Sequence, residues 1–211
     1  SGRVLAIQPV DTATASDVPA VWIRTAAEQP PSGWRYRGLA SLPEGSTDLA
    51  ALADLADQAG LPTFQEPSFA LGQVLREANA LRLRHLIINA MQTEPLIGSA
   101  ECIIDEHLET CVEMARRLKA ALGVKRAWLP LADPSRNRLG RARQACNGAG
   151  VRVVDLERRY PQHAPILVTA ALTGREAPPG GRPQDVGVLV LELAAVLGLA
   201  AALAHQARGE R

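Results

Sequence analysis

Apolar and polar positions alternate in blocks that predict a regular succession of strands and helices. From Leu83 onward, compact apolar runs alternate with longer segments whose apolar residues have helical spacing. The runs predict strands at 85–89, 127–131, 151–156 and 186–191, and the segments predict helices at 103–122, 134–149, 165–172 and from 194. Such alternation is typical of a parallel sheet with helices on both faces. We therefore predict an α/β fold with a Rossmann-like parallel sheet.

The first part of the chain has a different pattern. β-forming residues cluster at 3–9 and 18–24, and the turn residues at 29–33 block regular structure. A helix follows, with Thr47 or Asp48 as its cap and Gly60 at its end, and helical spacing resumes from Glu66 or Pro67 to Arg82. The pattern predicts a small N-terminal β appendage over 1–45 and an α/β core domain over 46–211.

Composition excludes several classes of function. The chain has 47% apolar residues, ample for a buried core, and its net charge of +1 gives no broad attraction for nucleic acid or anionic lipid. Its three cysteines form no C-x-x-C pair and its four histidines have no metal-ligand spacing, so neither an iron–sulfur cluster nor another metal site is expected. A reducing, cytoplasmic setting fits this cysteine content best.

One segment has the length of a membrane span. Residues 186–204 carry a single charge, Glu192. The first part is β-branched like a buried strand and the rest is rich in Ala and Leu like a helix packed on a sheet. A charge near the bilayer centre costs a few kcal/mol, so we predict a strand followed by a helix instead.

Polar residues follow the predicted strand 85–89. In an open α/β sheet, ligands bind in the crevice outside the carboxyl ends of the strands. Asn89 and Glu94 therefore have the place and the chemistry to bind the ribose, ribityl chain or ring edge of a nucleotide. The alternative is that Asn89 caps a turn and Glu94 is a solvated loop acid.

Two further loops have more than one interpretation. The turn 59–63 contains Gly60, which could let backbone N–H groups approach a phosphate, although a helix C-cap at Gly60 before Pro62 is the simpler interpretation. The loop 172–183 carries two arginines, Arg175 and Arg182, among prolines and glycines. It is either a functional or interface loop or a solvated turn.

The ordered set of segments resembles a known family. The resemblance rests on Ser1–Ile7, Ala59–Thr63, Leu86–Ala90 with Glu94 and Pro95, Tyr160 with Pro161, and the run from Leu172 to Leu189. In this order the segments resemble the RnfC subunit of Rnf-type electron transport complexes, whose flavin core is similar to that of the flavoprotein subunit of respiratory complex I.

The resemblance implies a function. In that family NADH delivers hydride to FMN in the crevice, while the protein supplies orientation and electrostatics. Carried over to this chain, the candidate cofactor contacts are Gly60, Thr63, Asn89 and Glu94, with no catalytic side chain. The implied partners are other subunits of an electron transport complex, and the implied location is the inner face of the membrane. The resemblance also implies an iron–sulfur module and the first half of a barrel, which this sequence does not contain. We expect that the sequence is a domain of a longer protein; the alternative is a short relative that lost its electron carriers.

The chain departs from the family pattern at several site positions. Asp57 and Gln58 stand where the family has glycines, and Glu66 stands where it has a lysine. Gln92 and Thr93 replace a Glu and a Cys, and Glu192 begins a segment that replaces an Asn-x-Gly-Thr pattern. Asp57 and Glu66, two acids in place of a glycine and a lysine, would repel a phosphate. The sequence therefore predicts a degenerate site that holds no cofactor. The alternative class is a cofactor-free structural or docking module that binds a partner subunit.

Overall fold

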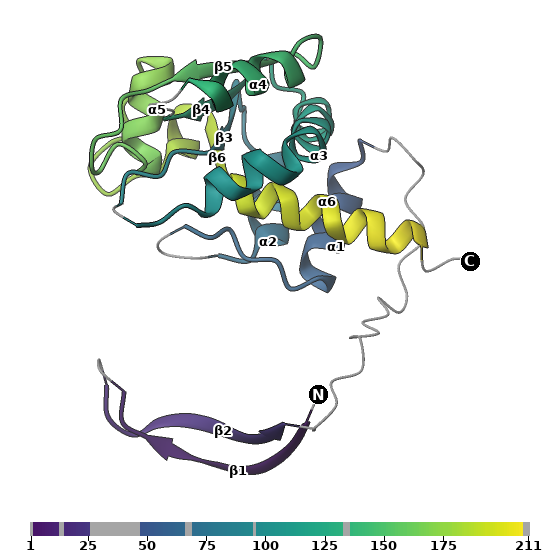
Figure 1. Ribbon diagram of the computed structural model, residues 1–211, viewed down its shortest axis with the longest axis vertical. Coiled ribbons are helices and arrows are strands. Elements are labelled where there is room, and N and C mark those ends of the chain that lie inside the picture. Colours follow the sequence, from purple (N-terminus) through teal and green to yellow (C-terminus); the bar gives the residue numbers. More distant parts are fainter. Residues whose placement is uncertain are drawn as a thin grey trace. The chain divides into compact units, whose positions relative to one another are not determined.

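The computed structural model describes residues 2–12, 15–25, 47–65, 69–94, 96–132 and 136–208 (Figure 1). The chain divides into two compact units, residues 1–37 and 38–211. The predicted turn 29–33 and the residues Glu66, Pro95 and Pro134 lie outside the described part.

The first unit contains a β-hairpin. Strand β1 (Gly2–Val10) pairs antiparallel with β2 (Val18–Thr25), and the register shifts between Val4 and Ala6. Its large apolar side chains, including Ile7 and Trp22, are exposed. The predicted N-terminal β appendage is confirmed.

Two short helices begin the second unit. Helix α1 (Leu49–Gln58) starts at Asp48, whose Oδ1 accepts hydrogen bonds from the backbone N–H groups of Ala50 and Ala51. This side-chain cap satisfies donors that have no partner within the helix. Helix α2 (Leu71–Asn79) packs against α1. The segment that was predicted to be helical up to Arg82 ends earlier, at Asn79, and Leu81 beyond it is exposed.

A four-stranded parallel sheet forms the centre of this unit. Its strands are β3 (His85–Asn89), β4 (Arg126–Leu131), β5 (Val151–Asp155) and β6 (Val188–Glu192), in the order β5-β4-β3-β6. Strand β6 starts two residues later than the sequence predicted. Residues 183–186 form a 3₁₀ helix, η1 (Pro183–Val186), and Gly187 then turns the chain at a φ of 77°.

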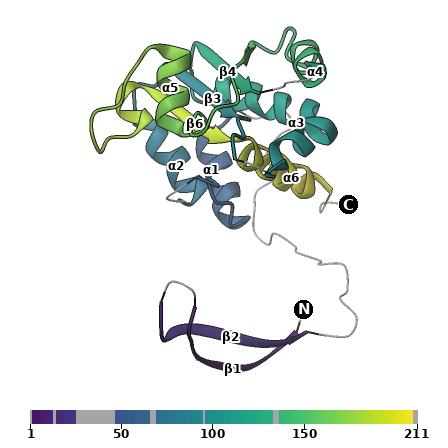
Figure 2. The same ribbon diagram turned by 60° about the vertical axis from the view of Figure 1, so that its left-hand side comes forward.

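Helices connect and cover the strands. They are α3 (Ser99–Ala121), α4 (Asn137–Ala145), α5 (Pro165–Thr173) and α6 (Leu193–Arg208). Residues of α1, α2, α3, α4 and α6 form one core with Leu86, Ile88 and Leu189 of the sheet. On the opposite face, Val168 of α5 packs with Ile87 and Trp128. Figure 2 shows the sheet between α5 and the other helices, so the predicted α/β architecture with helices on both faces is confirmed.

Among the described residues, no helix combines the length and the apolar character needed to cross a bilayer. The segment 186–204, which has the length of a span, is divided between the turn at Gly187, strand β6 and helix α6.

Candidate functional site

The strand order of the sheet locates a candidate crevice. The chain passes from β3 to β4 and β5 on one side, and returns to place β6 on the other side of β3. In open α/β sheets, ligands bind at the carboxyl ends of the strands where the order reverses in this way. Here that point lies between the ends of β3 and β6, where Asn89 is paired with Glu192 in the strand register.

Asn89 is buried, and its side-chain amide is fully hydrogen-bonded within the chain. Its Nδ2 donates to Glu192 Oε1 at 2.9 Å and to the backbone carbonyl of His163 at 3.0 Å. Its Oδ1 accepts from the backbone N–H of Met91 at 3.2 Å. Both amide hydrogens are therefore engaged, and Asn89 ties together the ends of β3 and β6 and the loop before α5.

Glu192 lies at the junction between β6 and α6. Burial raises the pKa of its carboxyl group to about 7, and the hydrogen bond from Asn89 opposes part of this rise. Glu192 therefore gains or loses a proton near neutral pH, whereas a solvated glutamate does so near its ordinary pKa of 4.5.

A second polar pair lies beside this cluster. Thr93 Oγ1 and His163 Nδ1 are 2.6 Å apart, and Thr93 is buried. The His163 ring also lies beside Tyr160, with ring centroids 5.8 Å apart. His163 thus contributes its carbonyl to Asn89 and its ring to Thr93, a role that no local sequence motif indicates.

The loop after Thr93 leads to the start of α3. Gln92 Oε1 accepts from the backbone N–H of Ala100 at 2.9 Å, and its Nε2 donates to Ser99 Oγ at 2.7 Å. Gln92 therefore acts as a remote cap for α3. Glu94, a predicted cofactor contact, is exposed.

Gly60 and Thr63 lie together in the loop between α1 and α2. Gly60 has a φ of 62°, and the backbone N–H groups of Ala59, Gly60 and Leu61 donate to carbonyls of α1. Thr63 is buried and forms a closed pair with Phe69, because its N–H donates to the Phe69 carbonyl at 2.9 Å and its Oγ1 accepts from the Phe69 N–H at 3.1 Å. A phosphate cradle is made of free backbone N–H groups, and in residues 59–63 those of all four non-proline residues are already used.

Asp57, in the last turn of α1, is a paired charge. Its carboxylate forms an ion pair with Arg76 of α2, which also contacts Asp54 at 3.1 Å. An open hollow of about 330 Å³ lies beside it. The residues that line this hollow are Asp57, Gly60, Leu61, Pro62, Phe69 and Ala70. The lining is mostly apolar and offers no cation to a phosphate.

The loop that contains Gly60 and Thr63 and the cluster around Asn89 both contact β6. Gln65 Nε2 donates to the backbone carbonyl of Val190 at 2.8 Å, which fixes the loop containing Gly60 and Thr63 against the strand that ends at Glu192. No hydrogen bond within the described part joins Gly60 or Thr63 directly to Asn89 or Glu94. Sequence patterns did not indicate Gln65, whose contact spans 125 positions of the chain.

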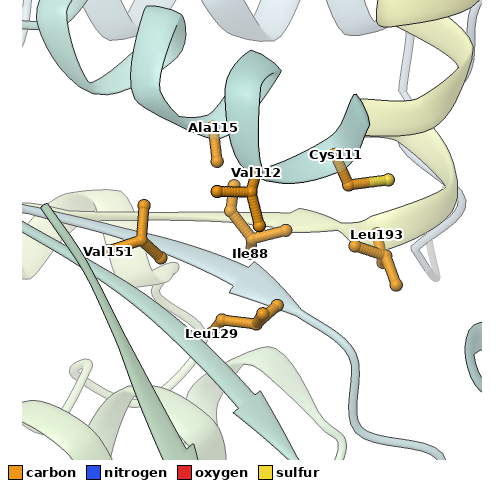
Figure 3. Close-up of a pocket in the computed structure, with 7 residues that line it drawn as sticks. All are labelled: Ile88, Cys111, Val112, Ala115, Leu129, Val151 and Leu193. Atoms are coloured by element: carbon orange, nitrogen blue, oxygen red, sulfur yellow. The ribbon is translucent and has the colours of Figure 1, made fainter. Parts of the chain in front are cut away.

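A second void, under α3, is a packing defect rather than a ligand site. It has a volume of about 10 Å³, near the size of a single water. Figure 3 shows Val112 and Ala115 of α3 above Ile88 and Leu129 of the sheet, with the Cys111 sulfur at one side. Its lining is apolar. Within the described ranges no group of three or more His, Cys, Asp or Glu residues is arranged to hold a metal ion.

Comparison with known proteins gives a consistent result. The family described as the Nuo51 FMN-binding domain matches residues 57–200. The chain is 29% identical over 117 residues to the C subunit of the proton-translocating ferredoxin:NAD(+) oxidoreductase complex of Clostridium ljungdahlii, covering 56% of this chain and 26% of that protein. It is 24% identical over 208 residues to the C subunit of the ion-translocating oxidoreductase complex of Yersinia pseudotuberculosis, covering 94% of this chain and 28% of that protein. The chain thus spans about a quarter of the length of these curated relatives.

The fold also occurs in a solved structure. The crystal structure of an NAD+-reducing [NiFe]-hydrogenase in the H2-reduced state contains a chain that superimposes with a TM-score of 0.63 at 17% identity. The match covers 84% of this chain and 38% of the hydrogenase chain. At this identity the likeness concerns the fold. The sequence matches to the two relatives confirm the predicted resemblance to RnfC.

Proposed function

The chain belongs to the family of the Nuo51 FMN-binding domain, and we propose that it serves as an RnfC-like domain in a membrane-associated, NADH-linked electron transport complex. Both curated relatives described above are C subunits of oxidoreductase complexes, and the longer match extends over 94% of the chain. Its partners in this proposal are the other subunits of such a complex, and its place is at the inner face of the membrane.

We further propose that this domain does not hold FMN in the way the family's description implies. The observation that carries this part is the hydrogen bonding of residues 59–63. The N–H groups of Ala59, Gly60, Leu61 and Thr63 all donate to carbonyls of the chain, and none is left for a phosphate. Binding an FMN phosphate there would require breaking these bonds, and at Thr63, which is buried, a donor or acceptor left unpaired costs about 1–3 kcal/mol.

The other candidate contacts support the same proposal. The Asn89 amide has no hydrogen left to donate, because Glu192 and His163 accept both. Asp57 adds a carboxylate at the position of a family glycine, and its ion pair with Arg76 holds it in place. The residues present therefore do not fit the cofactor, and the domain would act through its fold and surface within the complex.

An FMN titration followed by flavin fluorescence tests the cofactor part of the proposal. The matched control is the corresponding fragment of the Clostridium ljungdahlii protein. We expect the control fragment to bind and this chain to show no saturation up to about 100 μM, which corresponds to a binding free energy weaker than about −5.5 kcal/mol. Saturation at low micromolar FMN would overturn the degenerate-site proposal and favour an intact flavin site.

Membership in an electron transport complex needs a separate test. Membranes from cells with and without the gene are compared for NADH-dependent reduction of ferricyanide. We expect the rate to fall when the gene is deleted and to return when it is restored. An unchanged rate would contradict the proposed membership, whatever the result of the FMN titration.

A further inference from the structure

Four arginines gather at the amino-terminal edge of the sheet, opposite the candidate crevice. Arg126 pairs with His85 in the strand register, and Arg152 pairs with Trp128. Arg84 precedes His85 in the chain, and Arg175 follows α5. We call these four residues, Arg84, Arg126, Arg152 and Arg175, the arginine surface.

Packing holds two of these guanidinium groups in fixed places. The Arg152 guanidinium carbon lies 5.4 Å from the centre of the Trp128 ring, a cation–π arrangement. The Trp128 Nε1–H donates to His85 Nδ1 at 3.2 Å, which holds the indole in turn. Arg175 donates to the backbone carbonyl of Val186 at 2.9 Å. Preorganised guanidinium groups lose less entropy when they bind a carboxylate.

The charge of the arginine surface is not balanced locally. Burial lowers the pKa of His85 most, and the positive charges of Arg175, Arg126 and Arg84 lower it further. The ion pairs of the described residues engage arginines elsewhere, such as Arg116 with Glu113, and include none of the four. Glu176 follows Arg175 directly but forms no ion pair with these arginines in the described part. A net positive patch therefore exists on a chain whose total charge is +1.

We propose that the arginine surface is a docking site for an acidic segment of a partner protein. Neighbouring strands lie about 4.8 Å apart, so cations at the amino-terminal ends of β3, β4 and β5 are spread over about 10 Å. This spacing exceeds the reach of a single phosphate and suits successive carboxylates of an extended peptide. Arginine rather than lysine fits because the guanidinium group binds a carboxylate with two parallel hydrogen bonds. This inference goes beyond the proposed function and concerns the opposite edge of the sheet.

The test measures binding of a ten-residue poly-glutamate peptide to the full chain. A variant that keeps Trp128 as the single tryptophan (Trp22→Phe, Trp34→Phe) reports binding through the fluorescence of the indole that contacts Arg152. In this background, Arg126→Glu with Arg152→Glu reverses two charges on the arginine surface. The control, Arg136→Glu with Arg143→Glu, makes the same charge change at exposed positions at the start of and within α4, which packs on the other face of the sheet.

We expect the double reversal at Arg126 and Arg152 to weaken peptide binding at least about tenfold, and the α4 control to change it less than about twofold. The milder pair Arg126→Gln with Arg152→Gln should give an intermediate loss while circular dichroism shows an unchanged fold. Equal weakening by the α4 control would overturn the proposal. So would saturation by inorganic phosphate at the same concentration as the peptide, or tighter binding to vesicles of anionic lipid.

Discussion

The side-chain amide of Asn89 donates to the Glu192 carboxyl group at 2.9 Å, across 103 positions of the chain. The two residues end β3 and β6, the strands between which the order of the sheet reverses. In the crevice at this point, the polar groups of Asn89 and Glu192 therefore bind each other. Burial at this junction raises the pKa of Glu192 to about 7, and the hydrogen bond from Asn89 opposes part of that rise.

Replacing Asn89 by alanine should destabilise the fold. The substitution removes three hydrogen bonds and leaves the Met91 N–H, the His163 carbonyl and the Glu192 carboxyl group without this partner. We expect the free energy of unfolding in urea to fall by about 2–4 kcal/mol. Asn147→Ala, at an exposed position, is the control and should change it by less than about 0.5 kcal/mol. Equal effects of the two variants would show that the Asn89 contacts contribute little.

Glu192 should make stability depend on pH. Burial raises its pKa from 4.5 to about 7 in the folded chain. Between these two values the folded state holds a proton that the unfolded chain releases. The contribution of Glu192 to stability is therefore complete below about pH 4.5, falls as pH rises to about 7, and is constant above that.

The variant Glu192→Gln, which mimics the protonated form, isolates this effect. We expect it to unfold with the same free energy as the parent chain near pH 4.5 and to be more stable at pH 8, by an amount of the order of 3 kcal/mol. Urea unfolding of both proteins across this range gives the difference. Glu94→Gln removes the same charge at an exposed position and should show no such pH-dependent gain. A Glu192→Gln variant that is less stable than the parent at pH 8 would contradict the expected free-energy cost of burying the charged carboxylate.

Glycine at position 72 should be required for the contact between α1 and α2. A Cβ there would overlap the Ala53 carbonyl oxygen and the Asp57 carboxylate. We expect Gly72→Ala to reduce the free energy of unfolding by about 1–3 kcal/mol, because the two helices must separate. Gly140→Ala in α4 meets no atom within 4 Å and should stabilise the chain by about 0.5–1 kcal/mol. Melting temperatures that rise in both variants would show that α1 and α2 accommodate a methyl group at position 72 without loss of stability.

The strands and most helices could be predicted from the sequence because their patterns are local. The five residues of β3 are apolar or buried and are followed by polar residues, so both ends of this strand are visible in the chain itself. The start of α3 was missed because it depends on Gln92, whose side chain reaches Ser99 and Ala100 from outside the helix. Helical spacing gives no sign of such a remote cap.

The site was only partly predictable for a similar reason. Asn89 was identified from its place after a strand, but its partners, Glu192 and the His163 carbonyl, come from 103 and 74 positions away. Asp57 was expected to repel a phosphate, and no pattern in the sequence indicated that Arg76 pairs with it in the structure. Pairings between distant segments arise from the tertiary fold, so residue type and spacing along the chain do not reveal them. The Gly60, Thr63 and Glu94 assignments stay predictions until a flavin titration tests them.

The three cysteines should differ sharply in reactivity. Burial raises the pKa of Cys111 to about 12 and that of Cys146 to about 11, so almost no thiolate forms on either at neutral pH. Cys102 is exposed on α3. With iodoacetamide at pH 7.5, we expect Cys102 to be alkylated at least about 100-fold faster than the other two, as measured by peptide mass spectrometry. Urea should remove the difference by unfolding the core, and Cys102→Ser should abolish labelling of the native chain. Rapid labelling of Cys111 in that variant would mean that α3 leaves the sheet readily, which would contradict the burial of Cys111 in the core.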